Sequence, residues 1–242
     1  MKNGFNIARS WLVHFYTATG LIAAFLAFRA LLDGNARTVF LWLGLALFID
    51  ATDGPLARRW EVSRWIPTFN GRKLDDIVDY INYTLIPMIF AYQFGIVTGL
   101  GMVVLVVVLM VSAYGFSQEE AKTDDGFFTG FPSYWNLVIF YLYLLNVAPW
   151  VSAVVLGFFA VLVFIPVKYL TWKSPVLPRL TILLSLIWFG FLAGLMLFFE
   201  DAPSWLLWVS LLYPVYHFGV SFYLYLRRIS NKRILLKNKE SK

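Results

Sequence analysis

Five aspartates stand at the facing ends of two neighbouring apolar segments. Asp50 and Asp53 lie near the end of the first segment, and Asp75, Asp76 and Asp79 begin the next. An aspartate at membrane depth costs about 2.5–3.5 kcal/mol on insertion scales, so each needs a partner or a function. Clustered carboxylates neutralise their mutual repulsion by binding divalent cations that prefer oxygen ligands. The five aspartates are therefore the first candidates for chemistry.

Helical spacing predicts that these residues converge in one crevice. Residues three or four positions apart share a helix face, and a connection of modest length allows the two helices to lie antiparallel. We therefore expect four carboxylates to hold Mg²⁺ or Mn²⁺, with two ions in the site. The first face carries Asp50, Asp53, Gly54 and Ala57, and the second carries Gly71, Asp75, Asp79 and Tyr83.

Small residues and a cation accompany the carboxylates. Gly54 and Gly71 lack side chains where a phosphate or nucleotide would approach the backbone. Arg58 supplies a planar cation suited to a phosphate. An alternative is that the acids cap helix ends or pair with nearby arginines, and a capping role remains open for Asp75 or Asp76. Capping does not explain Asp50 and Asp53, because the helix dipole disfavours anions at a C-terminal end.

The elements that position these residues are predicted to be membrane helices. The chain has 242 residues, 60% of them hydrophobic and only 14% charged, with a mean hydropathy of +0.70. Soluble domains carry about 25% charged residues. There are no cysteines, which excludes disulfides and thiolate metal sites. We expect an all-α, polytopic integral membrane bundle that forms a single domain over residues 1–242, with no repeats.

Hydrophobic runs predict about eight transmembrane helices. All Lys and Arg except Arg29 and Arg37 then fall on one side, which places both termini and the acidic residues at the cytoplasmic face. The basic rim needs no nucleic acid to explain it. The predicted spans are Trp11–Leu32, Thr38–Ala57, Asp75–Phe94, Val97–Gln118, Phe131–Asn146, Trp150–Leu170, Leu180–Phe199 and Trp205–Leu226.

The acidic segment resembles the signature of a known family. Residues 50–79 read Asp50-x2-Asp53-Gly54-x2-Ala57-Arg58-x12-Gly71-x3-Asp75-x3-Asp79. This pattern is similar to that of the CDP-alcohol phosphatidyltransferases, intramembrane enzymes that join a CDP-activated half to an alcohol and release CMP. The twelve residues between Arg58 and Gly71 exceed the spacing of most members. A spacer of this length resembles that of the branch of bacterial phosphatidylcholine synthases. The eight predicted spans and the stretch 130–136 also resemble that branch.

The resemblance implies a substrate, partners and residue roles. The substrates would be CDP-diacylglycerol and choline, in a bacterial inner membrane and with membrane lipids around the chain; a homodimer is implied as well. Asp50, Asp53, Asp75 and Asp79 would hold the metals. Asp53, Gly54, Ala57, Arg58 and Gly71 would shape the CDP site. Asp75 and Asp79 would be catalytic, with Asp79 deprotonating or positioning the acceptor hydroxyl.

Choline carries a quaternary ammonium that donates no hydrogen bonds, so aromatic faces and a nearby anion would recognise it. Tyr and Trp also gather at membrane interfaces irrespective of function, which remains the alternative for each candidate. The candidates near the cytoplasmic ends are Tyr83, Tyr114, Glu119, Tyr134 and Trp135.

Three alternatives remain. The same reaction could use another acceptor, such as serine, inositol phosphate or glycerol phosphate. Asp75-Asp76-Ile77-Val78-Asp79 also matches a DDxxD prenyltransferase pattern, although no second acidic repeat occurs. A transporter could use membrane acids for coupling ions, but transporters place these near the midplane of repeated halves.

Overall fold

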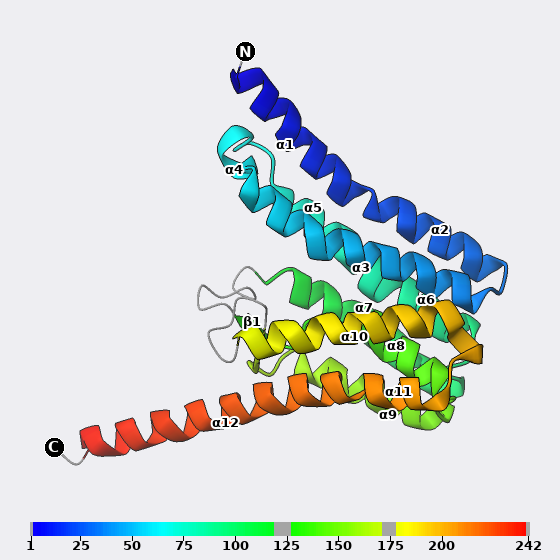
Figure 1. Cartoon of the computed structure of the whole chain (residues 1–242). Helices are drawn as coiled ribbons and strands as arrows, with labels where there is room; N and C mark the ends of the chain where they lie inside the picture. Colours follow the sequence, from blue (N-terminus) through cyan, green and yellow to red (C-terminus); the bar gives the residue numbers. More distant parts are fainter. Residues whose placement is uncertain (1, 119–126, 171–177, 241–242) are drawn as a thin grey trace. The chain divides into compact units, whose positions relative to one another are not determined.

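The computed structural model describes residues 2–118, 127–170 and 178–240. These residues are mostly helical, which confirms the all-α prediction (Figure 1). Two compact units are present: Met1–Phe116 with Ser133–Leu156, and Ser117–Pro132 with Gly157–Lys242. The expectation of a single membrane domain stays a prediction.

The first unit contains the whole acidic signature. Its helices α1 and α2 run alongside α3, and α5 follows α3 after a connection that contains the short α4 (Figure 1). The elements are α1 (Lys2–Ala18), α2 (Gly20–Leu32), α3 (Ala36–Arg59), α4 (Val62–Trp65), α5 (Gly71–Tyr80), the π-helix η1 (Ile81–Leu85), α6 (Ile86–Gln93), the 3-10 turn η2 (Gly99–Gly101), α7 (Met102–Phe116), α8 (Trp135–Leu144) and the first part of α9 (Pro149–Leu162).

Asparagine caps begin the two helices that carry the acids. The backbone N–H of Thr38 donates to the side chain of Asn35 at 3.0 Å, and that of Lys73 donates to Asn70 at 2.9 Å. Each cap satisfies an N–H group that has no partner within its helix. Asp75 therefore lies in the second turn of α5 and is not its cap, and the helix begins four residues before the predicted boundary.

A π-helical turn interrupts the helix that carries Asp75 and Asp79. The N–H of Ile86 donates to the carbonyl of Ile81, five residues earlier. Pro87 follows immediately; it has no N–H, and its ring crowds the carbonyl four residues before it. The wider turn accommodates that proline and carries Asn82, Tyr83 and Thr84 as buried residues.

Close packing joins α2 to α5. A Cβ atom on Gly20 would lie 2.6 Å from Cγ1 of Val78, so only glycine permits this approach. The carbonyl of Gly20 accepts a hydrogen bond of 3.0 Å from Nδ2 of Asn82. The same amide donates to the carbonyl of Val78 at 3.0 Å. Asn82 therefore holds α2 against the π-helical turn.

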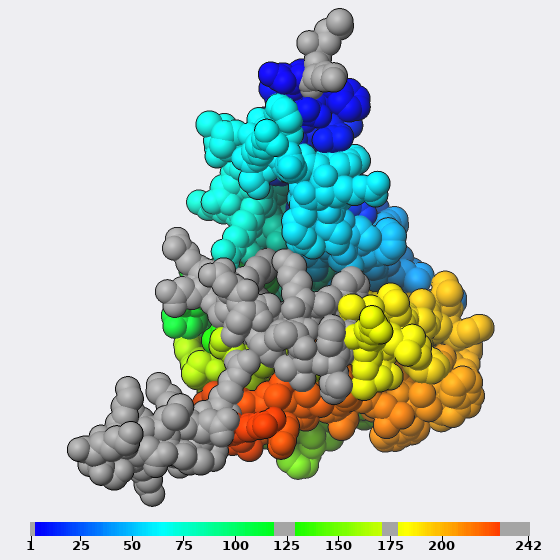
Figure 2. All heavy atoms as spheres, turned by 60° about the vertical axis from the view of Figure 1, so that its left-hand side comes forward, coloured from blue at the N-terminus to red at the C-terminus, as the bar shows by residue number. Residues whose placement is uncertain are grey.

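Aromatic contacts attach the α3–α5 connection to α1. The ring of Phe69 lies 4.5 Å from the ring of His14 and 5.2 Å from that of Trp11, measured between centroids. In Figure 2 the cyan residues of α4 lie beside the blue residues of α1. These contacts hold the connection against the helix that faces the acidic residues.

The second unit contains a short antiparallel ribbon and long helices. Strand β1 (Phe127–Thr129) pairs with β2 (Lys168–Leu170), with Phe128 opposite Tyr169. The ring of Tyr169 stacks on that of His217, and the N–H of Leu170 donates to Ser221. The remaining elements are the end of α9, α10 (Pro178–Phe198), the 3-10 turn η4 (Phe199–Asp201), α11 (Ser204–Ser210) and α12 (Leu212–Glu240).

Two predicted spans are shorter than expected. The helix predicted over Trp150–Leu170 ends at Leu162, because Pro166 has no N–H to donate to the carbonyl of Leu162 and its ring would crowd that carbonyl. The helix predicted over Phe131–Asn146 covers only Trp135–Leu144. It begins after Pro132 and Ser133 because Ser133 has a φ of 55°, which is outside the range of a right-handed helix.

Among the described residues, five helices are long and apolar enough to cross a membrane. They show a membrane protein with fewer such helices than the eight predicted, and the eight-span topology remains a prediction. The five helices are Asn3–Leu32, Ala36–Arg59, Gly99–Phe116, Arg179–Asp201 and Ser204–Arg227.

Candidate active site

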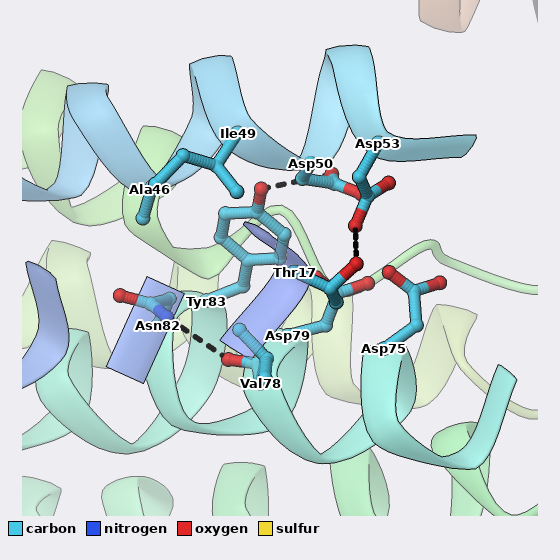
Figure 3. A pocket seen from close by; sticks show the side chains of 10 residues that line it. All are labelled: Thr17, Ala46, Ile49, Asp50, Asp53, Asp75, Val78, Asp79, Asn82 and Tyr83. Atoms are coloured by element: carbon cyan, nitrogen blue, oxygen red, sulfur yellow. Dashed lines mark hydrogen bonds between the residues drawn. The ribbon is translucent and has the colours of Figure 1, made fainter. Parts of the chain in front are cut away.

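Asp50 and Asp53 of α3 face the same pocket as Asp75 and Asp79 of α5, as the spacing of the two helical faces predicts (Figure 3). The pocket is built from α1, α3, α5 and η1, which all belong to the first unit. Ten residues line it: Thr17, Ala46, Ile49, Asp50, Asp53, Asp75, Val78, Asp79, Asn82 and Tyr83.

Three of the four signature aspartates form a group suited to a cation. Asp50, Asp75 and Asp79 each offer one carboxylate oxygen, and these oxygens lie within 4.8 Å of one another. On an octahedral Mg²⁺ two trans oxygens lie about 4.2 Å apart and two cis oxygens about 3.0 Å apart, so the three carboxylates must move closer together to share one ion. Because like charges this close repel one another, the group fits a divalent cation.

Asp53 is held by a side chain from another helix. Its Oδ2 atom accepts a hydrogen bond of 2.7 Å from the hydroxyl of Thr17 on α1. The residue is only 6% exposed, and its position on α3 directs its carboxylate into the pocket. Asp53 lies outside the group of three but lines the same wall.

Asp50 is also oriented by a hydroxyl group. The phenol of Tyr83 donates to Oδ2 of Asp50 at 2.8 Å, so the π-helical turn is tied directly to α3 (Figure 3). Tyr83 is buried, and its ring lies at the edge of the acidic pocket. Asp50 and Asp53 thus each accept a hydrogen bond from a hydroxyl group, and neither hydroxyl belongs to a signature residue.

Gly54 leaves room for the side chain of Arg58. A Cβ atom on Gly54 would lie 3.3 Å from Nη1 of Arg58, so the guanidinium folds back over the glycine one turn earlier on α3. Arg58 is exposed and Ala57 is half-buried. This arrangement presents a cation on the helix that also carries Asp50 and Asp53.

Gly71 begins α5 beneath a ring from α1. A Cβ atom on this residue would lie 2.6 Å from Cε1 of His14. The missing side chain therefore has a packing role, in addition to the substrate role that the resemblance implies.

The choline candidates lie in different surroundings. Tyr83 lines the acidic pocket, Tyr114 on α7 is 48% exposed, and Tyr134 precedes α8 and is half-buried. Trp135 is fully buried, and its indole N–H donates to Ser112 at 2.7 Å. Glu119 lies outside the described residues. The structure thus brings Tyr83, but none of the other described candidates, into the wall of the pocket.

Sequence reasoning missed two polar residues of the pocket, Thr17 and Asn82. Thr17 lies 36 residues before Asp53, and no local pattern links two residues across that distance. The sequence did contain a signal for Asn82. It is an amide side chain in an apolar run, seven residues after Asp75, and a buried amide needs a hydrogen-bond partner within the protein.

The fold and the site together define a helical membrane protein with a pocket whose carboxylates are suited to a divalent cation, and with an arginine on one of the same helices. Such a pocket can bind a diphosphate through its cation and through Arg58.

Comparison with known proteins gives the family. The profile of the CDP-alcohol phosphatidyltransferases matches residues 12–166, which include every signature position. A phosphatidylcholine synthase of Brucella melitensis is 37% identical over 200 residues, which cover 82% of this chain and 72% of the relative. The corresponding protein of Pseudomonas aeruginosa is 40% identical over 166 residues, 68% of this chain and 70% of the relative. A phosphatidylcholine synthase of Mesorhizobium japonicum is 40% identical over 164 residues, which cover 67% of this chain and 61% of the relative. The chain belongs to the CDP-alcohol phosphatidyltransferase family.

Proposed function

We propose that this protein is a phosphatidylcholine synthase, which condenses CDP-diacylglycerol with choline to give phosphatidylcholine and CMP. The observation that carries the proposal is the group formed by Asp50, Asp75 and Asp79 within the family's matched region. The relatives named phosphatidylcholine synthase, at 37–40% identity, support choline as the acceptor.

The chain's own residues supply the binding chemistry. Asp50, Asp75 and Asp79, with Asp53 beside them, are suited to hold Mn²⁺ or Mg²⁺, and we propose two ions. When bound, the cations neutralise the diphosphate and the charge that develops on departing CMP. Arg58 binds a phosphate oxygen, and Gly54 and Ala57 keep the wall of α3 low enough for the nucleotide to approach. Gly71 does the same at the start of α5.

The transfer forms one bond and breaks one. The choline oxygen attacks the phosphorus that bears diacylglycerol, and the bond from that phosphorus to the oxygen of CMP breaks. Asp79 accepts a hydrogen bond from the choline hydroxyl, directs its lone pair toward the phosphorus, and takes up the hydroxyl proton as the new bond forms, before passing that proton to water. A carboxylate that contacts a dication is a weak base, so the larger contribution of Asp79 is orientation.

Aromatic side chains are the proposed recognition site for the ammonium group of choline. Tyr83 lies in the pocket wall, Tyr114 and Trp135 lie on α7 and α8 of the same unit, and Tyr134 directly precedes α8. Each desolvated contact between a cation and an aromatic face contributes about 0.5–2 kcal/mol. Glu119 completes the proposed set as an anion.

We further propose that the protein lies in a bacterial inner membrane with eight spans and cytoplasmic termini. The excess of Lys and Arg on one side supports this orientation. It places the pocket at the cytoplasmic face. Choline and CMP are both water-soluble, so they can enter and leave the pocket from the cytoplasm. The homodimer implied by the family is part of the same proposal.

The deciding experiment measures CMP release and lipid product from purified protein in detergent. CDP-diacylglycerol and Mn²⁺ or Mg²⁺ are supplied with choline, serine, glycerol 3-phosphate or inositol phosphate in parallel. We expect product only with choline. Product with another alcohol would retain the cation site and overturn the acceptor. Absence of metal-dependent CMP release with every alcohol, from protein shown to be folded, would overturn the proposed activity.

A further inference from the structure

We propose that two hydroxyl groups outside the acidic signature, those of Tyr83 and Thr17, are positioning groups for the cation site. Each holds one carboxylate of α3 in the orientation that faces α5. The inference rests on the proposed function, because it assigns these hydroxyls a role in binding the divalent cation of that enzyme.

Tyr83 reaches Asp50 from the π-helical turn. Its hydroxyl donates to Oδ2 of Asp50 at 2.8 Å, and only 7% of the residue is exposed. Asp50 is the α3 member of the group of three carboxylates, whereas Asp75 and Asp79 come from α5. The phenol therefore orients Asp50, which is the member of this group that α3 contributes.

Thr17 reaches Asp53 from α1. Its hydroxyl donates to Oδ2 of Asp53 at 2.7 Å, shorter than its 3.3 Å approach to the carbonyl of Val13 within its own helix. Both residues are about 6% exposed. A buried charged acceptor strengthens such a bond, because water cannot replace the donor.

These bonds restrict a motion that affects cation binding. The terminal torsion of an aspartate is broad, so its carboxylate rotates freely unless something holds it. A donor on one oxygen limits that rotation and fixes the direction that the group presents to a cation. Hydrogen bonds of this kind around metal ligands change metal affinity or activity by about 10–100-fold when removed.

The structure offers an internal control for simple helix adhesion. One residue before each member of the Thr17–Asp53 pair, the hydroxyls of Tyr16 and Thr52 also meet across α1 and α3 at 2.7 Å. This second bond joins the same helices over the same distance but touches no carboxylate. If Thr17 only holds the helices together, loss of either bond has the same effect.

Tyr80 provides the corresponding control for Tyr83. Its hydroxyl donates to the carbonyl of Leu109 at 3.1 Å, so it ties α5 to α7 away from the pocket. Tyr80→Phe and Tyr83→Phe each remove one oxygen atom from the same helical segment, and only the latter removes a bond to a carboxylate.

The experiment measures Mn²⁺ binding directly, by electron paramagnetic resonance of free Mn²⁺ against the detergent-solubilised full chain without substrates. We expect Tyr83→Phe and Thr17→Val to weaken binding by about 10–100-fold. Tyr80→Phe and Tyr16→Phe should bind within about threefold of the unmodified protein, and Thr17→Ser should restore binding because it keeps the hydroxyl. Thermal unfolding of each variant tests that the protein is folded.

Unchanged Mn²⁺ affinity in both Tyr83→Phe and Thr17→Val would overturn the inference. Equal losses in the test and control variants would also overturn it, because the hydroxyls would then serve packing alone. Failure of the proposed function is distinguishable, since it would appear in the unmodified protein as absence of lipid product from choline. An unmodified protein that binds Mn²⁺ but uses another alcohol would leave the hydroxyl assignment standing.

Discussion

The imidazole of His14 occupies the space that a side chain on residue 71 would need, with Cε1 only 2.6 Å from the position of a Cβ atom there. His14 lies on α1 and is 8% exposed, so it has little room to move aside. The first helix of the chain thus requires glycine at the start of α5, one turn before Asp75.

We expect Gly71→Ala to destabilise the protein by about 1–3 kcal/mol, the usual effect of overpacking. His14→Ala in the same chain should relieve the collision, so the double variant should unfold at a higher temperature than the sum of the two single effects predicts. Thermal unfolding in detergent measures this coupling. Strictly additive effects would show that the ring does not limit position 71.

Removal of one ligand from the carboxylate group should abolish cation-dependent turnover. Asp50→Asn, Asp75→Asn and Asp79→Asn each replace an anionic ligand by a neutral amide, and we expect turnover to fall by more than about 100-fold. Chelation by EDTA should have the same effect on the unmodified protein, reversed by added Mn²⁺ or Mg²⁺.

Asp76 is the matched control, because it lies on α5 beside Asp75 but outside the group of three. Asp76→Asn should retain turnover within about threefold, since it removes no ligand. Comparable losses at all four positions would contradict the assignment and indicate a general electrostatic effect.

Arg58 should bind the phosphate of the nucleotide lipid through its planar guanidinium. Lysine keeps the charge but not the paired donors, so Arg58→Lys should raise KM for CDP-diacylglycerol by about 10–100-fold, the value of a charged hydrogen bond. Arg59→Lys, at the next exposed position of α3, is the control and should leave KM unchanged. A rise in KM for choline alone would disprove the phosphate role.

Asn82 should contribute to stability through two carbonyl groups. Its amide donates to Gly20 and Val78 at 3.0 Å each, and Asn82→Ala removes both bonds. Each lost hydrogen bond contributes about 0.5–1.5 kcal/mol of stability. Thermal unfolding should therefore show a larger loss than in Asn136→Ala, where the side-chain carbonyl accepts from the adjacent N–H of Leu137. Equal losses would refute this explanation.

Tyr114 offers a test of the aromatic recognition of choline. We expect Tyr114→Ala to raise KM for choline by about 2–30-fold, the range of one cation–aromatic contact, without changing KM for CDP-diacylglycerol. Tyr92→Ala removes an exposed tyrosine from α6 and serves as the control. An unchanged KM for choline would remove Tyr114 from the proposed cage.

The membrane class and the acidic site follow from the sequence because both depend on local periodicity. Apolar runs predict membrane helices, and offsets of three and four place Asp50 with Asp53 and Asp75 with Asp79 on helix faces. The convergence of these faces was predictable because the two helices are neighbours along the chain. The structure confirms that they line one pocket.

Tertiary structure decided the rest, because the responsible contacts join residues far apart in the chain. Thr17 meets Asp53 across 36 positions, and His14 restricts Gly71 from another helix. The π-helical turn before Pro87 places Tyr83 against Asp50, and helical periodicity alone does not predict that change of pitch. Hydropathy could not resolve the end of α9 at Leu162 either, since the residues beyond it are as apolar as a span but form a turn followed by the strand Lys168–Leu170.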